Sequence, residues 1–159
     1  MSLEKLKSPA ELAAIRAKLD SQGRRLVFTN GCFDLLHVGH VRYLQQARAL
    51  GDALLVVVNG DLSVRALKGP ARPVNGEQDR AEVLASLACV DYVTIFHEER
   101  VTNLVRIICP HVYAKGGDYT VDRLDPGERV ALEQAGAEIC ILPLVPGKST
   151  TGIIEKWRN

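Results

Sequence analysis

Short apolar runs alternate with amphipathic stretches along most of the chain. Runs rich in Val, Ile and Leu predict β-strands, and apolar residues spaced three and four apart predict helices between them. The run at 53–58 is apolar at every position, as expected for a central parallel strand that is buried on both faces. The predicted strands are 25–29, 53–59, 92–96, 111–114 and 138–142, and the predicted helices between them are 38–50, 77–88, 101–108 and 126–135.

This order of elements predicts the fold class. Alternating strands and helices favour an α/β fold, a Rossmann-like doubly wound parallel sheet of about five strands with helices on both faces. Ser8 and Pro9 begin a further helix that runs toward Gly23. We therefore expect one domain over 1–159, with a leading helix in 1–24 and the core in 25–159.

Glycine and polar residues follow four of the predicted strands. In parallel α/β sheets, ligands bind beyond the carboxyl ends of the strands, where loops and helix N-termini meet. We therefore expect the functional residues to gather at this edge of the sheet. The segments concerned are 29–34, 59–61, 115–118 and 146–151.

Composition narrows the range of partners. The chain has 20 Lys and Arg against 19 Asp and Glu, so its net charge of +1 provides no general field for nucleic acid or an anionic membrane. Aromatic residues make up only 5%, which disfavours an RNA-binding surface. No stretch reaches the ~18 apolar residues of a membrane span, and the scattered cysteines lack CxxC spacing. We expect a cytoplasmic protein with reduced thiols.

The segment His37-Val38-Gly39-His40 carries the first candidate chemistry. It lies at a predicted helix start, where free backbone N–H groups and the helix dipole favour anions. Gly39 allows a phosphate to approach the backbone, and the two imidazoles can donate hydrogen bonds to oxygens that gain charge during phosphoryl transfer. Two ordinary loop histidines would show the same spacing, so the motif alone leaves both interpretations open.

The residues around this motif favour the functional interpretation. The run 27–40, VFTNGCFDLLHVGH, resembles the signature of the cytidylyltransferase-like nucleotidyltransferase superfamily. The resemblance implies a Rossmann-type fold in which His37 and His40 contact a nucleoside triphosphate and stabilise the transition state at its α-phosphorus. Further nucleotide-binding residues expected in this run are Thr29, Asn30, Gly31, Phe33 and Gly39.

The segment 66–74 is punctuated by Gly and Pro and predicts a loop too irregular for a helix. A solvated Lys68 fits this sequence, but in the resembling enzymes a lysine of this mobile loop reaches the phosphates, which implies a catalytic role. The resemblance also places Arg80 near the substrates, although surface ion pairs with nearby carboxylates would explain it as well. The acceptor-binding residues expected are Asp34, Asn59, Asp61, Arg72 and Arg80.

Two later segments complete the expected nucleotide site. Ser149, Thr150 and Thr151 precede the last helix, where hydroxyl groups can cap the helix or bind an oxyanion. The superfamily typically carries a Ser-Thr-Thr run here that grips phosphates. The run 115–119, KGGDY, resembles that of heptose-1-phosphate adenylyltransferases, whether alone or fused to a kinase. Its expected nucleotide-binding residues are Lys115, Gly117 and Asp118.

The resemblance to the heptose enzymes is nearly full length. It implies transfer of AMP from ATP to D-glycero-β-D-manno-heptose 1-phosphate, a sugar 1-phosphate, to give an ADP-heptose for a bacterial surface glycan. Glycerol-3-phosphate cytidylyltransferase and FMN adenylyltransferase are the alternatives within the superfamily, and a nucleotide-binding module without turnover is the alternative outside the enzymes.

The expected chemistry requires little from the protein besides positioning and charge. A phosphate monoester has a second pKa of about 6, so the acceptor supplies its own nucleophile. We expect Mg²⁺ to be held mainly by the ATP phosphates, with Asp34 an indirect contributor and no metal fixed by the protein. Trp157 and the 101–108 helix leave room for a homodimer.

Overall fold

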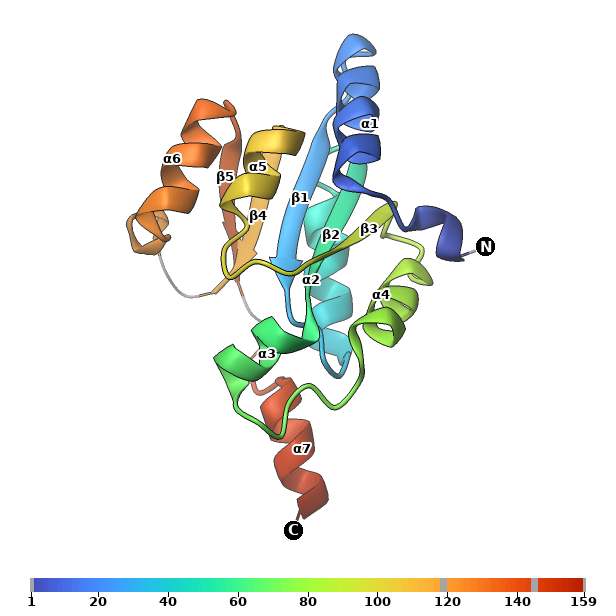
Figure 1. Cartoon of the computed structure of the whole chain (residues 1–159), viewed down its shortest axis with the longest axis vertical. Helices are drawn as coiled ribbons and strands as arrows, with labels where there is room; N and C mark the ends of the chain where they lie inside the picture. Colours follow the sequence, from blue (N-terminus) through green and yellow to red (C-terminus); the bar gives the residue numbers. More distant parts are fainter. Residues whose placement is uncertain (1, 118–119, 144–145, 159) are drawn as a thin grey trace.

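Five parallel strands form one sheet in the order β3-β2-β1-β4-β5 (Figure 1). The computed structural model describes residues 2–117, 120–143 and 146–158. The predicted α/β fold with a parallel sheet is confirmed. The strands are β1 Leu26–Gly31, β2 Ala53–Asn59, β3 Tyr92–Phe96, β4 Val112–Gly116 and β5 Glu138–Leu142. The helices are η1 Ser2–Lys5, α1 Pro9–Ser21, α2 Val38–Arg48, α3 Asp61–Lys68, α4 Glu77–Ala85, α5 Thr102–Ile108, η2 Val121–Arg123, α6 Pro126–Gln134 and α7 Thr150–Arg158.

The sheet separates two apolar layers. Strand β2 is buried along its whole length and contributes to both. Leu55 and Val57 join the cluster formed with α1, α5 and α6, whereas Leu54 and Val56 join the cluster formed with α2 and α4. Side chains alternate between the faces of a strand, so an uninterrupted apolar run is what a doubly covered strand requires.

The chain reverses its direction across the sheet at β1. It passes from β1 through β2 to β3 on one side, and then returns to β4 and β5 on the other. The β1–β4 ladder covers only the pairs Val27–Val112 and Phe28–Tyr113. Crevices of this kind, beyond the carboxyl ends of the strands at a reversal of strand order, are where doubly wound sheets bind ligands.

Helix α3 corrects the prediction of a loop around Lys68. The helix covers 61–68, and Lys68 is its last residue. Gly69 and Pro70 follow directly, and their punctuation ends this helix instead of excluding one. Asp61 in the first turn and Lys68 in the last turn both complement the helix dipole.

The last helix differs from the other α-helices in its packing. None of the described residues of α7 is buried, and Trp157 is 81% exposed. In Figure 1 this helix extends away from the sheet, beyond the end at which the arrowhead of β1 points. None of the helices in the described part of the chain has the length and apolarity needed to cross a bilayer.

Candidate functional site

The two histidines of the β1–α2 connection hold each other in place. His37 is the N-cap of α2, and its Nδ1 accepts a hydrogen bond from the Gly39 N–H at 3.0 Å. The backbone N–H of His37 donates in turn to Nδ1 of His40 at 3.3 Å. The ring centroids lie 4.0 Å apart. Since both Nδ1 atoms accept, each neutral ring carries its hydrogen on Nε2 and presents it as a donor.

Both imidazoles are uncharged near neutral pH. Burial, together with the neighbouring His37, lowers the pKa of His40 to about 4. Burial also lowers the pKa of His37, and the charge of Lys148 adds to this effect. The pair therefore offers two directed N–H donors without positive charge, which suits hydrogen bonding to phosphate oxygens better than proton transfer.

Small residues make room for this arrangement. A Cβ on Gly39 would lie 2.7 Å from Cε1 of His37, so a side chain there would displace the ring. Phe33 has a left-handed φ of 47°, which is rare for a bulky residue, and its ring lies 5.6 Å from that of His40. A Cβ on Gly31 would lie 2.9 Å from the Phe33 ring. Gly31 thus leaves room for the Phe33 ring, and the Phe33 ring packs beside His40.

Asp34 ties this connection to the segment after α3. Asp34 is 3% exposed, and its carboxylate accepts from Arg72 Nε at 2.6 Å and from the backbone N–H groups of Val74 and Asn75. Burial raises the pKa of the Asp34 carboxyl, but the two backbone donors and Arg72 outweigh it, so the pKa lies below its ordinary value. Asp34 and Arg72 thus hold two loops together, and their predicted contact with an acceptor stays a prediction.

Arg80 is buried, not a surface residue. Its guanidinium donates to the carbonyls of Asn75 and Cys32 and pairs with Asp61 at 2.8 Å. It is 2% exposed, so the alternative of surface ion pairs is wrong. Arg80 joins the segments after β1, β2 and α3.

The two other polar residues predicted at the end of β2 also have internal partners. The Asn59 amide donates to Ser63 Oγ at 2.9 Å, and Asn59 is 5% exposed. The backbone N–H of Asp61 donates to Glu77 at 2.7 Å, which fixes the start of α3. The structure therefore brings Asn59, Asp61, Arg72 and Arg80 to one end of the sheet as a supporting network.

Lys68 lies near this network despite the missed helix. Burial raises the pKa of the Cys32 thiol, and the charges of Lys68 and Arg80 oppose this rise. Lys68 itself is exposed. The charge of Lys68 thus acts on Cys32 in the β1–α2 connection, and a contact of Lys68 with the phosphates stays a prediction.

The predicted residues at the end of β1 have internal partners. Thr29 is fully buried, and its hydroxyl lies 2.7 Å from that of Tyr43. Asn30 accepts a hydrogen bond from the Tyr113 hydroxyl at 2.9 Å, which links β1 to β4. Thr29 thus belongs to the packing beneath the site, and a nucleotide contact by either residue stays a prediction.

The loop before α7 closes the site from the opposite side. Thr150 donates to the carbonyl of Leu35 at 2.8 Å, and Ser149 Oγ accepts from the Gly152 N–H at 2.9 Å. Thr151 is exposed.

The predicted nucleotide-binding residues at the end of β4 are only partly described. Lys115 is half-buried, and the Gly117 N–H donates to the carbonyl of Leu142 at 3.1 Å. Asp118 lies outside the described residues.

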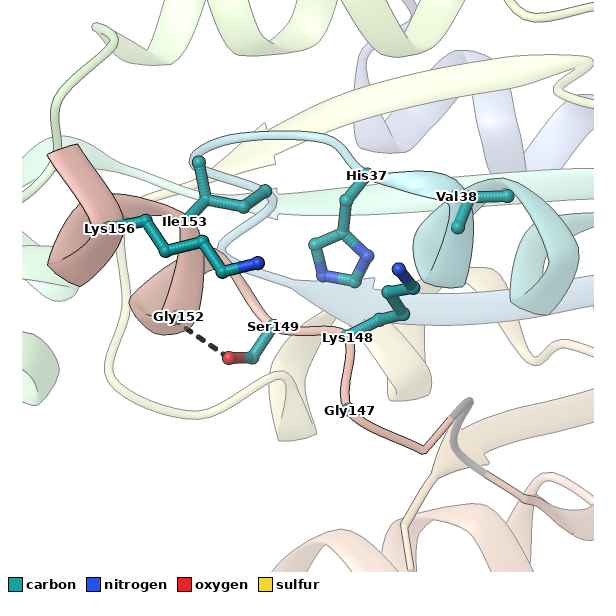
Figure 2. Close-up of a pocket in the computed structure, with 8 residues that line it drawn as sticks. All are labelled: His37, Val38, Gly147, Lys148, Ser149, Gly152, Ile153 and Lys156. Atoms are coloured by element: carbon teal, nitrogen blue, oxygen red, sulfur yellow. Dashed lines mark hydrogen bonds between the residues drawn. The ribbon is translucent and has the colours of Figure 1, made fainter.

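A cavity of about 300 Å³ separates the histidine motif from α7. Figure 2 shows the His37 ring at its centre, with the side chains of Lys148 and Lys156 pointing toward it and the Ser149 hydroxyl directed toward Gly152. Two ammonium groups, a hydroxyl and an imidazole N–H around one space form a site for phosphate groups. The lining residues are His37, Val38, Gly147, Lys148, Ser149, Gly152, Ile153 and Lys156.

The model of the Cytidylyltransferase-like family matches residues 28–155, which include both sides of this cavity. The chain belongs to the cytidylyltransferase-like family. This assignment confirms the superfamily inferred from the run 27–40 and agrees with the reversal of strand order at β1.

Relatives of this cytidylyltransferase-like chain include two larger proteins. The bifunctional protein HldE of Geotalea uraniireducens is 53% identical over 155 residues, which are 98% of this chain and 31% of that protein. The bifunctional protein HldE of Geobacter sulfurreducens is 51% identical over 152 residues, 96% of this chain and 31% of that protein. The chain thus spans about a third of the length of these relatives.

Two solved structures share the fold. The crystal structure of the lipopolysaccharide core biosynthesis protein from Thermoplasma volcanium has a TM-score of 0.64 and 29% identity, covering 77% of this chain and 98% of that one. Pantoate-β-alanine ligase from Francisella tularensis has a TM-score of 0.56 and 15% identity, covering 96% of this chain and 76% of that one. The second likeness concerns the fold alone.

Sequence reasoning included Lys148 in the segment 146–151 but named neither of the two lysines that line the cavity as a site residue. Lys148 precedes the Ser-Thr-Thr run, and Lys156 lies seven residues after Ser149. Residues at i and i+7 share one face of a helix, so the spacing of Ser149 and Lys156 was the available signal. The position of α7 in the structure shows that both lysines face the histidine motif.

Proposed function

We propose that this chain transfers AMP from ATP to D-glycero-β-D-manno-heptose 1-phosphate and releases pyrophosphate. The observation that carries the proposal is the cavity in which the His37 N–H donor faces Lys148 and Lys156, at the carboxyl end of β1. Such a site binds a chain of phosphates, as the transfer of a nucleotide requires. The relatives named HldE at about 50% identity support the same activity.

The neutral histidines fit a phosphate acceptor. A pKa of about 4 makes His40 a poor base at neutral pH. A sugar 1-phosphate needs no base, because its oxyanion attacks the α-phosphorus directly while the bond to the departing pyrophosphate breaks. His37 and His40 would then donate Nε2–H groups to oxygens on which charge develops, and Lys68 would add positive charge.

The choice of a heptose phosphate rests on fewer residues. Lys115 and Gly117 belong to the run that resembles the heptose enzymes; Lys115 lies near the end of β4, and Gly117 follows the strand directly. The solved relative from Thermoplasma volcanium is named a lipopolysaccharide core biosynthesis protein, which agrees with a surface-glycan precursor as product. We propose that the reaction takes place in the cytoplasm and that the active form is a homodimer.

Magnesium would be bound through the nucleotide in this scheme. Within the described residues, no group of three His, Cys, Asp or Glu side chains could hold a metal ion. The Asp34 carboxylate, the nearest to the motif in sequence, already accepts from Arg72 and two backbone donors. When bound to the phosphates, Mg²⁺ neutralises charge on the triphosphate, and the protein's residues orient the complex.

A substrate screen tests the proposal. The purified chain would be incubated with ATP or CTP and with heptose 1-phosphate, glycerol 3-phosphate or FMN, and pyrophosphate release would be measured. We expect release with ATP and heptose 1-phosphate. Release only with CTP and glycerol 3-phosphate, or only with FMN, would reject the heptose assignment. Nucleotide binding without release in any combination would identify a binding module.

A further inference from the structure

An arm formed by residues 2–7 precedes α1 and lies beside α4 and the edge strand β3 (Figure 1). Leu6 forms a parallel bridge with Val93 of β3, and the backbone N–H of Lys7 donates to the Val93 carbonyl at 2.9 Å. The Leu6 side chain packs against the apolar layer that α2 and α4 form with the sheet. The arm is therefore built into the fold on the side of the sheet that α2 and α4 cover.

Lys5 of this arm binds the turn that follows α4. It is half-buried, and its ammonium donates to the carbonyls of Leu87 at 3.1 Å and Val90 at 2.7 Å. Hydrogen bonds from a charged donor are stronger than those between neutral groups, and a cation near the C-terminal end of a helix complements the helix dipole. Lys5 therefore fixes the place at which α4 ends.

The same turn is tied to the end of α2. Asp91, which follows the turn, pairs with Arg48 at 2.9 Å and accepts from the backbone N–H of Leu54 at 2.8 Å. Arg48 is the last residue of α2. The arm, the end of α4 and the end of α2 thus meet at one junction, which lies at the amino ends of β2 and β3.

Helices α2 and α4 connect this junction with the histidine motif. Helix α2 has 11 residues, with His37 as its N-cap and His40 in its first turn, and α4 has 9 residues and carries the buried Arg80. Helices of this length transmit a displacement from one end to the other as rigid units. A shift at the junction would therefore move the imidazole N–H donors and the loops that Arg80 joins.

We infer that Lys5 is a positioning residue for nucleotidyl transfer, acting through α4 and α2 from the opposite end of the sheet. The inference rests on the proposed transfer reaction, in which the placement of His37 and His40 determines the rate. A displacement of about 1 Å in a catalytic group can lower a rate about a hundredfold. The loss of one charged contact far from the reacting atoms should cost less than that.

Kinetics on variants of the arm test the inference. Lys5→Met removes the ammonium and keeps the length of the side chain. Lys7→Met is the matched control, because Lys7 lies on the same arm and contributes its backbone N–H, which the substitution retains. We expect Lys5→Met to lower kcat for pyrophosphate release roughly fivefold with KM for ATP unchanged, Lys7→Met to change neither, and Lys5→Arg to restore most of the rate.

The imidazole groups provide a readout that needs no turnover. In proton–nitrogen correlation spectra of the free protein, the ring signals of His37 and His40 should shift in Lys5→Met and not in Lys7→Met. The signals of His111, which accepts from Leu26 at the start of β1, serve as an internal reference.

A lower denaturation midpoint of Lys5→Met without a change in kcat or in the imidazole signals would overturn the inference, because Lys5 would then only stabilise the fold. If Lys5→Met does not fold, Lys5→Gln, which keeps a donor without the charge, replaces it in both measurements. Absence of pyrophosphate release from the wild type as well would reject the transfer reaction, and the imidazole signals would still test whether Lys5 places the histidines.

Discussion

The two sides of the cavity are built in opposite ways. On the side of α2 and α4, Arg80 and Asp34 are nearly fully buried, and their side chains form hydrogen bonds with other segments of the chain. On the side of α7, the lysines are exposed and the helix buries none of its described residues. The side of α2 and α4 is held by buried hydrogen bonds, and the side of α7 is held mainly by the loop that leads into the helix.

This difference places the directed hydrogen-bond donors on one side of the cavity and the positive charges on the other. The rigid side carries neutral imidazoles whose Nδ1 acceptors and Nε2 donors are set by the backbone. The loosely held side carries cations on long side chains, which need no exact geometry to attract a phosphate. Preorganised donors matter most where charge develops during transfer, and mobile cations can follow a leaving group.

The largest effect should come from breaking the rigid side. Arg80→Met leaves the carbonyls of Cys32 and Asn75 without a donor and Asp61 without its cation. We expect a loss of about 3 kcal/mol in the free energy of unfolding, measured by urea denaturation at pH 7. Arg158→Met removes an exposed charge from α7 and should change this free energy by less than about 0.5 kcal/mol. Similar values for the two variants would refute the contrast.

Removing the His40 donor should affect catalysis more than stability. Asn places an acceptor near the Nδ1 position of histidine but no donor at Nε2, whereas Gln places an amide donor near Nε2. We expect His40→Asn to lower kcat about a hundredfold, or about 2.7 kcal/mol, and His40→Gln to lower it less. Steady-state kinetics on both variants measures the difference. Equal kcat values for His40→Asn and the wild type would contradict the role of this residue.

Acid should destabilise the histidine pair. The pKa of His40 is lowered to about 4 in the folded chain from an ordinary value of 6.5. The unfolded chain therefore binds more protons than the folded chain below pH 6.5, so the free energy of unfolding falls as the pH falls. Between pH 6.5 and 4 the wild type should lose more stability than His40→Gln. Parallel urea curves across this range would show that His40 is not neutral in the fold.

The fold could be predicted from sequence because its signal is local and repeated. The buried run of β2 is apolar at every one of its first six positions, and the capping box of Ser8 and Glu11 marks the start of α1. Helix α3 was missed because Gly69 and Pro70 masked its short amphipathic pattern. Gly and Pro residues indicate where a helix ends, but next to a short helix they also make its amphipathic pattern difficult to recognise.

The site was predicted only where a motif is contiguous. His37, Gly39 and His40 lie within one turn of chain, and the structure brings them together as expected. The burial of Arg80 depends on three separate loops that meet around it, and no local pattern records such a meeting. Lys156 was not predicted as a site residue for a related reason. An exposed lysine on a short helix can be assigned to the site only once the structure places that helix opposite His37.

The smallest effect should come from loosening α7. Thr150→Val removes the hydroxyl that donates to the carbonyl of Leu35 and keeps the shape of the side chain. We expect a loss of about 1 kcal/mol or less in the free energy of unfolding, because one partly buried hydrogen bond is lost. Thr151→Val is the matched control for stability, because Thr151 is exposed. Hydrogen exchange should show faster exchange confined to 150–158 in Thr150→Val. Faster exchange that also reaches α2 would mean that the two sides of the cavity are coupled, and the contrast between them would fail.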